Sequence, residues 1–323
     1  MKALALFSGG LDSMLSISTI VKQGIEVEAI FISTGFGPLN TELLKRRANM
    51  AGASFRVVDI CDKYLQDVLL NPKYGYGKAI NPCIDCHGYM FKVALSMLDD
   101  LNASFVISGE VLGQRPMSQR AQALKSVEKL SEDKENKILR PLSAKLLPPT
   151  LPEINGWVDR EKLLDFSGRG RTRQMELAKI YGYSDYESPA GGCLLTLEAF
   201  KNKIIDYIKF NKLDSSNAKL LRLGRHLRLP NGAKMIISRN ETEGNAILEM
   251  LDDKNIKMSE IITNKIGAIS LLDNNASDDD IKLACSLALA YTKNPNDGEC
   301  KFNNKIINAK SVDKSLAQKY FIV

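Results

Sequence analysis

The stretch Lys2-Ala-Leu-Ala-Leu-Phe7, which runs directly into Ser8-Gly9-Gly10-Leu11-Asp12-Ser13, decides the fold of this chain. The apolar run predicts a buried strand, and helical periodicity begins just after the glycines. Because glycine has no Cβ, the backbone can turn tightly there and come close to phosphate oxygens. Amide groups of the turn and of the helix start would face the anion, which the helix dipole also favours. The unit therefore predicts a cradle for a pyrophosphate group.

The order of residues separates this loop from the Walker motif. That motif needs G-x-x-x-x-G-K-[ST], and no lysine follows the glycines here. The alternative interpretation is an ordinary strand-to-helix turn with a Ser or Asp N-cap. Asp12 and Ser13, placed after the first strand of the chain, favour nucleotide binding over that alternative.

Strands and helices alternate through the first half of the chain, which predicts a parallel sheet with helices on both faces. Ligands of such sheets bind beyond the carboxyl ends of the strands, where residues 8–13, 33–35 and 108–110 would converge. The expected strands are residues 2–7, 26–33, 54–60, 105–108 and 138–142. The expected helices are residues 12–22, 41–51, 64–70 and 87–101.

The second half predicts a smaller α+β domain. Residues 146–152 contain three prolines and are expected to be irregular, and the domain junction is expected between residues 173 and 192. A helix over 196–210 precedes strands 226–229 and 234–238, which Pro230-Asn231-Gly232 joins as a hairpin, and 281–293 is another helix. Residues 201–240 hold ten Lys or Arg against two acidic residues.

The bulk composition is that of an ordinary globular protein with room for two domains. Of 323 residues, 44% are hydrophobic and 25% are charged, and no apolar run approaches the ~20 residues that span a bilayer. The N-terminus lacks the features of a signal peptide, so a cytoplasmic protein without membrane association is expected. Its net charge of +6 permits a polyanionic partner without requiring one.

The six cysteines are unlikely to form structural disulfides in that compartment. Cys83 and Cys86 follow Asn81-Pro82 at a helix start, which lowers a thiol pKa, so either is a candidate reactive thiolate. Three interpretations remain open: two incidental cysteines, a redox or persulfide pair of Cys86 with Cys193, or an iron–sulfur cluster. Cys83, Cys86 and Cys193 would hold that cluster and leave one iron open, with zinc as a lesser variant.

These motifs together resemble the PP-loop tRNA thiolation enzymes, the ATP pyrophosphatases that make thiouridine in tRNA. The resemblance covers about residues 1–195 and includes Ser108–Met117, Arg140–Lys145 and Glu187–Cys193. A shorter stretch, Gly224–Gly232 with Ile236–Asn245, is similar to the RNA-binding domain of NFACT ribosome-associated proteins. The implied architecture is an adenine nucleotide alpha hydrolase-like PP-loop domain over 1–180 and an RNA-binding domain over 190–323.

The resemblance also implies roles for individual residues. Cys86 and Cys193 match the two cysteines of the 2-thiouridine enzymes, and Cys83 completes the set of a [4Fe-4S] cluster. Mg²⁺ would lie between the ATP phosphates and Asp12. The implied ATP-binding residues are Ser8, Gly9, Gly10, Leu11, Asp12, Ser13, Phe31, Ile32, Ser33 and Gly109.

The function predicted from these features is an ATP-dependent tRNA sulfurtransferase. Adenylation would turn a base carbonyl oxygen into a good leaving group, which sulfur then replaces. A cysteine desulfurase, a relay protein or free sulfide would supply the sulfur, and a homodimer is left open. The alternatives are a PP-loop ligase or amidase for a small molecule, and a non-catalytic RNA-binding quality-control factor. The basic residues expected to contact tRNA phosphates are Arg169, Arg171, Arg173, Lys201, Lys203, Arg222, Arg225 and Arg228.

Overall fold

The computed structural model describes residues 1–38, 40–186 and 192–323, which form two compact units, Met1–Thr196 and Leu197–Val323. Most of the predicted motif at Glu187–Cys193 therefore lies outside the described residues, although Cys193 itself is described. No helix in the described part of the chain combines the length and the apolar character needed to cross a membrane.

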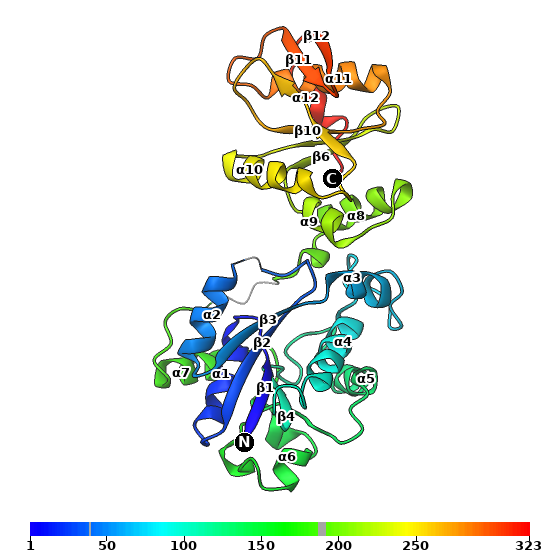
Figure 1. The fold of residues 1–323 in the computed structure, drawn as a ribbon. Helices are drawn as coiled ribbons and strands as arrows, with labels where there is room; N and C mark the ends of the chain where they lie inside the picture. The colour runs from blue at the N-terminus through cyan, green and yellow to red at the C-terminus, as the bar shows by residue number, and fades with distance from the viewer. Residues whose placement is uncertain (39, 187–191) are drawn as a thin grey trace. The chain divides into compact units, whose positions relative to one another are not determined.

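The first unit is built on a five-stranded parallel sheet of order β3-β2-β1-β4-β5 (Figure 1). The predicted parallel α/β class is confirmed. β1 pairs with β2 from Lys2↔Glu26 to Leu6↔Ile30 and with β4 from Ala3↔Phe105. The strands are β1 (Lys2–Leu6), β2 (Glu26–Ser33), β3 (Ser54–Asp59), β4 (Phe105–Ser108) and β5 (Ile138–Leu139).

Helices cover both faces of this sheet (Figure 1). α1 (Leu11–Val21), α2 (Thr41–Met50) and α7 (Thr172–Ile180) lie on one face, and α4 (Cys83–Ser96) and α5 (Ala121–Ser131) lie on the other. Because helices cover both faces of the sheet, β1 is a continuous apolar run. α1 is buried on nearly every side, and its buried residues include serines and Thr19 as well as apolar side chains.

Two local predictions were wrong. The helix expected over 64–70 is α3 (Cys61–Tyr64) continued by a π-helical turn, Leu65–Leu69. α4 begins at Cys83, which confirms the helix start expected at the two cysteines, although the helical periodicity is evident only from residue 87. The proline-rich 146–152 segment is not wholly irregular, since α6 (Leu151–Ile154) begins inside it. Pro152 is tolerated there because the first turn of a helix needs no amide donor, and Thr150 and Glu153 form a capping box.

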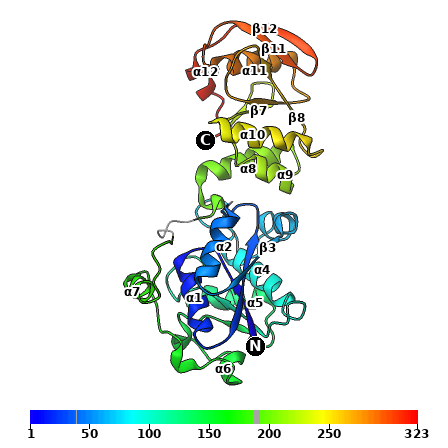
Figure 2. The ribbon, with the colours of Figure 1, turned by 60° about the vertical axis from the view of Figure 1, so that its left-hand side comes forward.

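The second unit contains two antiparallel sheets, of order β6-β7-β10-β8 and β12-β11-β9 (Figure 2). The predicted hairpin is confirmed, since β6 and β7 pair antiparallel and Gly232 takes a φ of +95° in the turn. The strands are β6 (Arg225–Arg228), β7 (Lys234–Ile237), β8 (Met258–Glu260), β9 (Ile262–Thr263), β10 (Ser270–Asp273), β11 (Gly298–Phe302) and β12 (Lys305–Ala309). The helices are α8 (Glu198–Phe210), α9 (Ser215–Leu220), α10 (Glu241–Glu249), α11 (Asp278–Ala290) and α12 (Lys314–Gln318).

Candidate nucleotide and cysteine site

The PP-loop lies at the point where the strand order of the sheet reverses. β1 and β4 are neighbours in the sheet although two strands separate them in the sequence. A Cβ on Gly109, directly after β4, would lie 2.5 Å from both the carbonyl carbon of Asp12 and the amide nitrogen of Ser13. The loop after β4 therefore packs against the first turn of α1, which confirms the predicted convergence of these two segments. Crevices at such points bind the ligands of open α/β sheets.

The loop has the conformation that a phosphate cradle requires. Gly9 takes a φ of +77°, and a Cβ there would collide with the Leu44 side chain. Gly10 is the N-cap of α1 and has no side chain to satisfy the first amides of the helix. The buried Arg47 guanidinium fixes the turn by donating from Nη1 to the Gly9 carbonyl over 3.2 Å.

Asp12 presents one engaged and one available carboxylate oxygen. Oδ2 accepts a hydrogen bond from Gln114 Nε2 at 2.6 Å and lies 3.5 Å from Arg171 Nη2. Oδ1 is buried and has no hydrogen-bond partner among the described residues. Burial raises the pKa of Asp12, although Arg171 and Gln114 oppose the shift. An unused carboxylate oxygen beside a phosphate cradle fits Mg²⁺, which prefers oxygen ligands.

Backbone hydrogen bonds show which of the three residues predicted to contact adenine, Phe31, Ile32 and Ser33, faces the PP-loop. The Ile30 carbonyl accepts from Phe7 N on the β1 side, whereas the Ser33 carbonyl accepts from Ile60 N on the β3 side. Successive residues of a parallel strand direct their backbone groups to opposite sides. Ile32 is therefore the one of the three whose backbone faces the PP-loop side.

Two backbone hydrogen bonds hold the segment that contains Cys193 between the residues after β2 and the loop that leads into α4. Leu194 N donates to the Phe36 carbonyl at 3.1 Å, and Ile80 N donates to the Leu195 carbonyl at 3.2 Å. The Cys193 and Cys83 thiols are near enough to Cys86 to affect its ionisation. The three cysteines that the sequence singled out thus lie in one neighbourhood, and none forms a disulfide.

The prediction of a low thiol pKa at the helix start was wrong for Cys86. Burial raises the pKa of Cys86 to about 12, and an interaction with the Tyr64 hydroxyl only partly opposes the rise. The neighbouring cysteine thiols raise it further, since a second thiolate nearby would be repelled. The resting Cys86 is therefore a protonated thiol at neutral pH.

The iron–sulfur interpretation has no support in this arrangement. Among residues 1–38, 40–186 and 192–323, no three His, Cys, Asp or Glu side chains are disposed to hold a metal ion. Cys83 Sγ instead accepts a hydrogen bond from Asn81 Nδ2 at 3.1 Å.

A buried ion-pair network connects the cysteines with the loop that packs against the PP-loop. None of its residues was assigned a role from the sequence. Glu110 Oε1 lies 2.7 Å from His87 Nδ1, and Arg140 Nε donates to Glu110 Oε2 at 2.8 Å. Burial opposes ionisation of Glu110, but Arg140 and His87 hold its pKa to about 2. His87 follows Cys86, and Glu110 follows Gly109. The only signal in the sequence was that Glu110 and Arg140 lie within two stretches typical of the family.

The structure uses most of the basic residues predicted to bind RNA for internal contacts. Arg171 lies at Asp12, and Arg228 pairs with Asp206 and lies over the Phe210 ring. Arg169 is exposed, and Arg239 donates to the carbonyl of Arg222. The remaining pairs are Arg173 with Asp165, Lys201 with Glu198, Lys203 with the Leu221 and Gly224 carbonyls, and Arg225 with the Ser238 carbonyl.

Comparison with known proteins finds a family match within each of the two units. Residues 1–145 match the family described as Thiamine biosynthesis protein (ThiI), and residues 224–320 match the NFACT protein RNA binding domain. The tRNA-specific 2-thiouridylase MnmA of Mycobacterium tuberculosis is 32% identical over 111 residues, 30% of each chain. That of Acidothermus cellulolyticus is 28% identical over 102 residues, 27% of this chain and 28% of its own. The chain spans under a third of the length of these relatives.

Among solved structures, a 4-thiouridine synthetase in complex with RNA and ATP aligns with a TM-score of 0.40 and 21% identity. The alignment covers 56% of this chain and 40% of that one. A predicted subunit of tRNA methyltransferase from Methanocaldococcus jannaschii aligns with a TM-score of 0.31 and 25% identity, over 44% of this chain and 69% of that one. The chain joins a ThiI-like PP-loop domain to a C-terminal NFACT-type RNA-binding domain, with distant homology to the 2-thiouridylases.

Proposed function

We propose that this protein is an ATP-dependent tRNA sulfurtransferase, which adenylates a base carbonyl oxygen of tRNA and replaces it with sulfur. The observation that carries the proposal is the position of the Cys193 segment, hydrogen-bonded to the Ile80 loop that leads into Cys83 and Cys86. The Glu110–His87 contact connects these cysteines to Gly109 and hence to the PP-loop. We assign residues 1–180 to catalysis and 190–323 to RNA binding, in a cytoplasmic enzyme.

In this proposal the PP-loop binds the phosphates of ATP. Amides from Ser8 to Asp12 would face the phosphates, since Ser13 N already donates to the Gly10 carbonyl, and the Ile32 backbone would face the adenine. Mg²⁺ held by Asp12 Oδ1 would offset the negative charge of the phosphates. Arg171, which lies beside Asp12, is placed to contact a phosphate oxygen, so we assign it to ATP rather than to RNA.

The chemistry explains why a PP-loop and two cysteines occur together. The base carbonyl oxygen attacks the α-phosphorus of ATP, and pyrophosphate leaves. The terminal sulfur of a cysteine persulfide then attacks the activated carbon, and AMP departs with the original oxygen. The second cysteine attacks the inner sulfur, which releases the thiolated base and leaves a Cys86–Cys193 disulfide. A thiol reductant restores the two thiols.

Both cysteines are partly exposed, so exposure alone does not assign their roles. The raised pKa of Cys86 keeps its thiol protonated at rest, so we assign it the second attack, after it loses its proton, and we assign the persulfide to Cys193. The persulfide donor is a cysteine desulfurase or a relay protein, which transfers persulfide sulfur to the thiol. Free sulfide, which is already fully reduced, would instead open the Cys86–Cys193 disulfide and give the Cys193 persulfide and the Cys86 thiolate. A cluster route would require the three cysteines to rearrange.

Mass spectrometry of tRNA nucleosides, from cells with and without the gene, tests the proposal. Loss of one thiolated nucleoside supports it and identifies the product, and purified protein should restore that nucleoside with ATP and a sulfur source. An unchanged profile, in a strain without a redundant enzyme, contradicts it. ATP turnover to AMP that requires a small molecule instead of tRNA would then indicate a ligase. Binding of RNA without any turnover would indicate a quality-control factor.

A further inference from the structure

The loop before α4 carries a motif that the nucleotide and cysteine site does not use. Lys73-Tyr-Gly-Tyr-Gly-Lys78 interleaves two lysines with two tyrosines, and the rings of Tyr74 and Tyr76 are 43% and 44% exposed. Exposed aromatic rings among cations are typical of surfaces that bind single-stranded nucleic acid. The tyrosines stack on bases, and the lysines neutralise phosphates.

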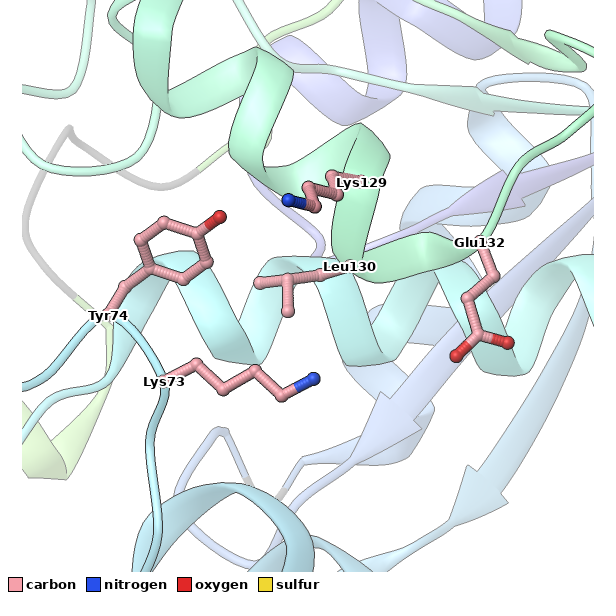
Figure 3. Close-up of a pocket in the computed structure, with 5 residues that line it drawn as sticks. All are labelled: Lys73, Tyr74, Lys129, Leu130 and Glu132. Atoms are coloured by element: carbon pink, nitrogen blue, oxygen red, sulfur yellow. The ribbon is translucent and has the colours of Figure 1, made fainter.

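This loop forms one wall of a cavity of about 360 Å³ in the first unit (Figure 3). Lys73 and Tyr74 come from the loop, and Lys129, Leu130 and Glu132 come from the C-terminal end of α5 and the residues after it. Figure 3 shows Leu130 on the α5 wall, with the Tyr74 ring on one side of it and Glu132 on the other. The volume lies within the range of pockets that take small organic ligands.

The charges of this cavity favour an anion with an aromatic group. Within the described part of the chain, neither Lys73 nor Lys129 forms an ion pair, whereas Glu132 is already paired with Lys92. The two lysines are therefore available for phosphate oxygens. Leu130 and the Tyr74 ring supply the apolar surfaces between which a base stacks. The Glu132 carboxylate can accept a hydrogen bond from an N–H group on the base edge.

The cavity wall is fastened to the helix turn that carries the cysteines. The Asp85 carboxylate accepts hydrogen bonds from Lys73 N at 2.7 Å and from Tyr74 N at 3.0 Å. Asp85 precedes Cys86 in the sequence. Further along the loop, Gly77 N donates to the Asn81 carbonyl, and the Asn81 side chain donates to Cys83 Sγ. A nucleotide in the cavity would therefore be positioned relative to the thiols.

We propose that this cavity, the Tyr74 pocket, binds one unpaired nucleotide of the RNA substrate, next to the base that is modified. The proposal rests on the proposed function for the identity of the neighbouring chemistry. A base in folded tRNA must leave its stack before it can react. A pocket that holds the adjacent nucleotide would keep the strand open and limit the positions that the cysteines can reach.

The test measures the affinity of the full chain for fluorescent hexauridylate and for unmodified tRNA by anisotropy, at several salt concentrations. Tyr74→Ala should weaken hexauridylate binding at least about fivefold, because stacking on the ring is lost, and Tyr74→Phe should stay within about twofold. Lys129→Ala should weaken binding and lower the salt slope by about one charge. Lys45→Ala, which removes an exposed lysine of α2 outside the pocket, is the matched control.

Affinities of Tyr74→Ala and Lys129→Ala equal to that of the wild type would overturn the proposal. Both side chains are exposed, so unchanged thermal unfolding should accompany the loss of binding. Assays of tRNA thiolation with the same variants separate this proposal from the proposed function. Reduced binding in a protein that never thiolates tRNA would retain the pocket and reject the function. Full thiolation with unaltered binding in both variants would reject the pocket and retain the proposed function.

Discussion

His87 Nδ1 lies 2.7 Å from Glu110 Oε1, and this contact joins the N-terminal part of α4 to the segment that follows β4. Glu110 follows Gly109, which packs against the first turn of α1, and His87 follows Cys86 in the first turns of α4. The predicted adenylation site and the predicted thiols are thus positioned by adjacent residues. A displacement of the segment after β4 should disturb both.

Substitution Glu110→Gln should destabilise the first unit by about 3 kcal/mol or more, because it leaves the Arg140 charge buried and poorly compensated. Trp157, the single tryptophan, lies in the same unit, so its fluorescence during urea unfolding reports on that unit. Glu128→Gln is the matched control, because Glu128 also pairs with Arg140 but is 44% exposed. It should cost about 1 kcal/mol or less. Equal effects of the two substitutions would contradict the assignment.

Acid should remove the stabilisation that the Glu110 carboxylate provides. The pKa of Glu110 in the folded protein, about 2, lies below the ordinary value of 4.5. Its stabilising effect is therefore complete above pH 4.5 and is lost as the pH falls through about 2. The difference in unfolding free energy between wild type and Glu110→Gln should shrink over this window. A difference that is constant between pH 6 and pH 3 would show that the ionised form is not what stabilises the fold.

Substitution Gly109→Ala should weaken ATP binding by at least about tenfold, because the new Cβ would meet backbone atoms of Asp12 and Ser13 at 2.5 Å and displace the first turn of α1. Calorimetric titration with a non-hydrolysable ATP analogue measures the effect. Gly170→Ala is the control, since a Cβ there meets no atom within 4 Å. Equal affinities for the two variants would mean that the first turn of α1 does not contact the nucleotide.

The raised pKa of Cys86 predicts slow alkylation that rises with pH. Only the thiolate reacts, so the rate with iodoacetamide should increase about tenfold for each pH unit from 7 to 10, without a plateau. Peptide mass spectrometry follows Cys86 by itself, with glutathione as the reference thiol. A plateau below pH 9.5 would show that burial does not govern this thiol, since the structure places its pKa at about 12.

Substitution of each clustered cysteine by alanine distinguishes the routes of sulfur transfer. Cys86→Ala and Cys193→Ala should abolish tRNA thiolation and leave binding of the ATP analogue within about twofold, because the PP-loop lies on other segments. Cys83→Ala is the matched variant and should retain thiolation by the persulfide route. Loss of activity in all three variants, with iron and labile sulfide in the purified protein, would restore the cluster. A fully active Cys193→Ala would exclude the persulfide route.

The sequence was sufficient for the parts of the fold that depend on local patterns. The run 2–7, its glycine loop and the alternation that follows predict a parallel sheet, because each pattern acts over a few residues. The hairpin at Pro230-Asn231-Gly232 was predictable for the same reason. The strands β8 to β12 were not predicted, although they are no shorter as a group than β4 to β7, which were.

The sequence indicates which types of residue form the site, but it does not indicate which residues each of them contacts. In the sequence, Arg171 and Arg228 both resemble ordinary surface cations. In the fold, Arg171 lies beside Asp12 and Arg228 pairs with Asp206. The pKa of Cys86 depends on its burial, on the Tyr64 hydroxyl and on the Cys193 thiol, and these two residues come from distant parts of the chain. The helix dipole, the one effect visible in the sequence, is weaker than that burial. Glu110 had no reason to be chosen until Arg140 and His87 were seen around it.

Arg171 provides the sharpest distinction between the sequence prediction and the structure. If it binds ATP, Arg171→Ala should weaken the affinity for the ATP analogue by about tenfold, the effect of one charge-assisted hydrogen bond, and leave tRNA affinity unchanged. If it contacts RNA, as the sequence suggested, the salt slope of tRNA binding should fall by about one charge and ATP affinity should hold. Lys162→Ala is the control, because Lys162 is an exposed cation of the same unit that pairs with Asp159 and is not among the residues predicted to bind RNA. Calorimetry with the ATP analogue and anisotropy with tRNA on both variants therefore decide which polyanion this arginine binds.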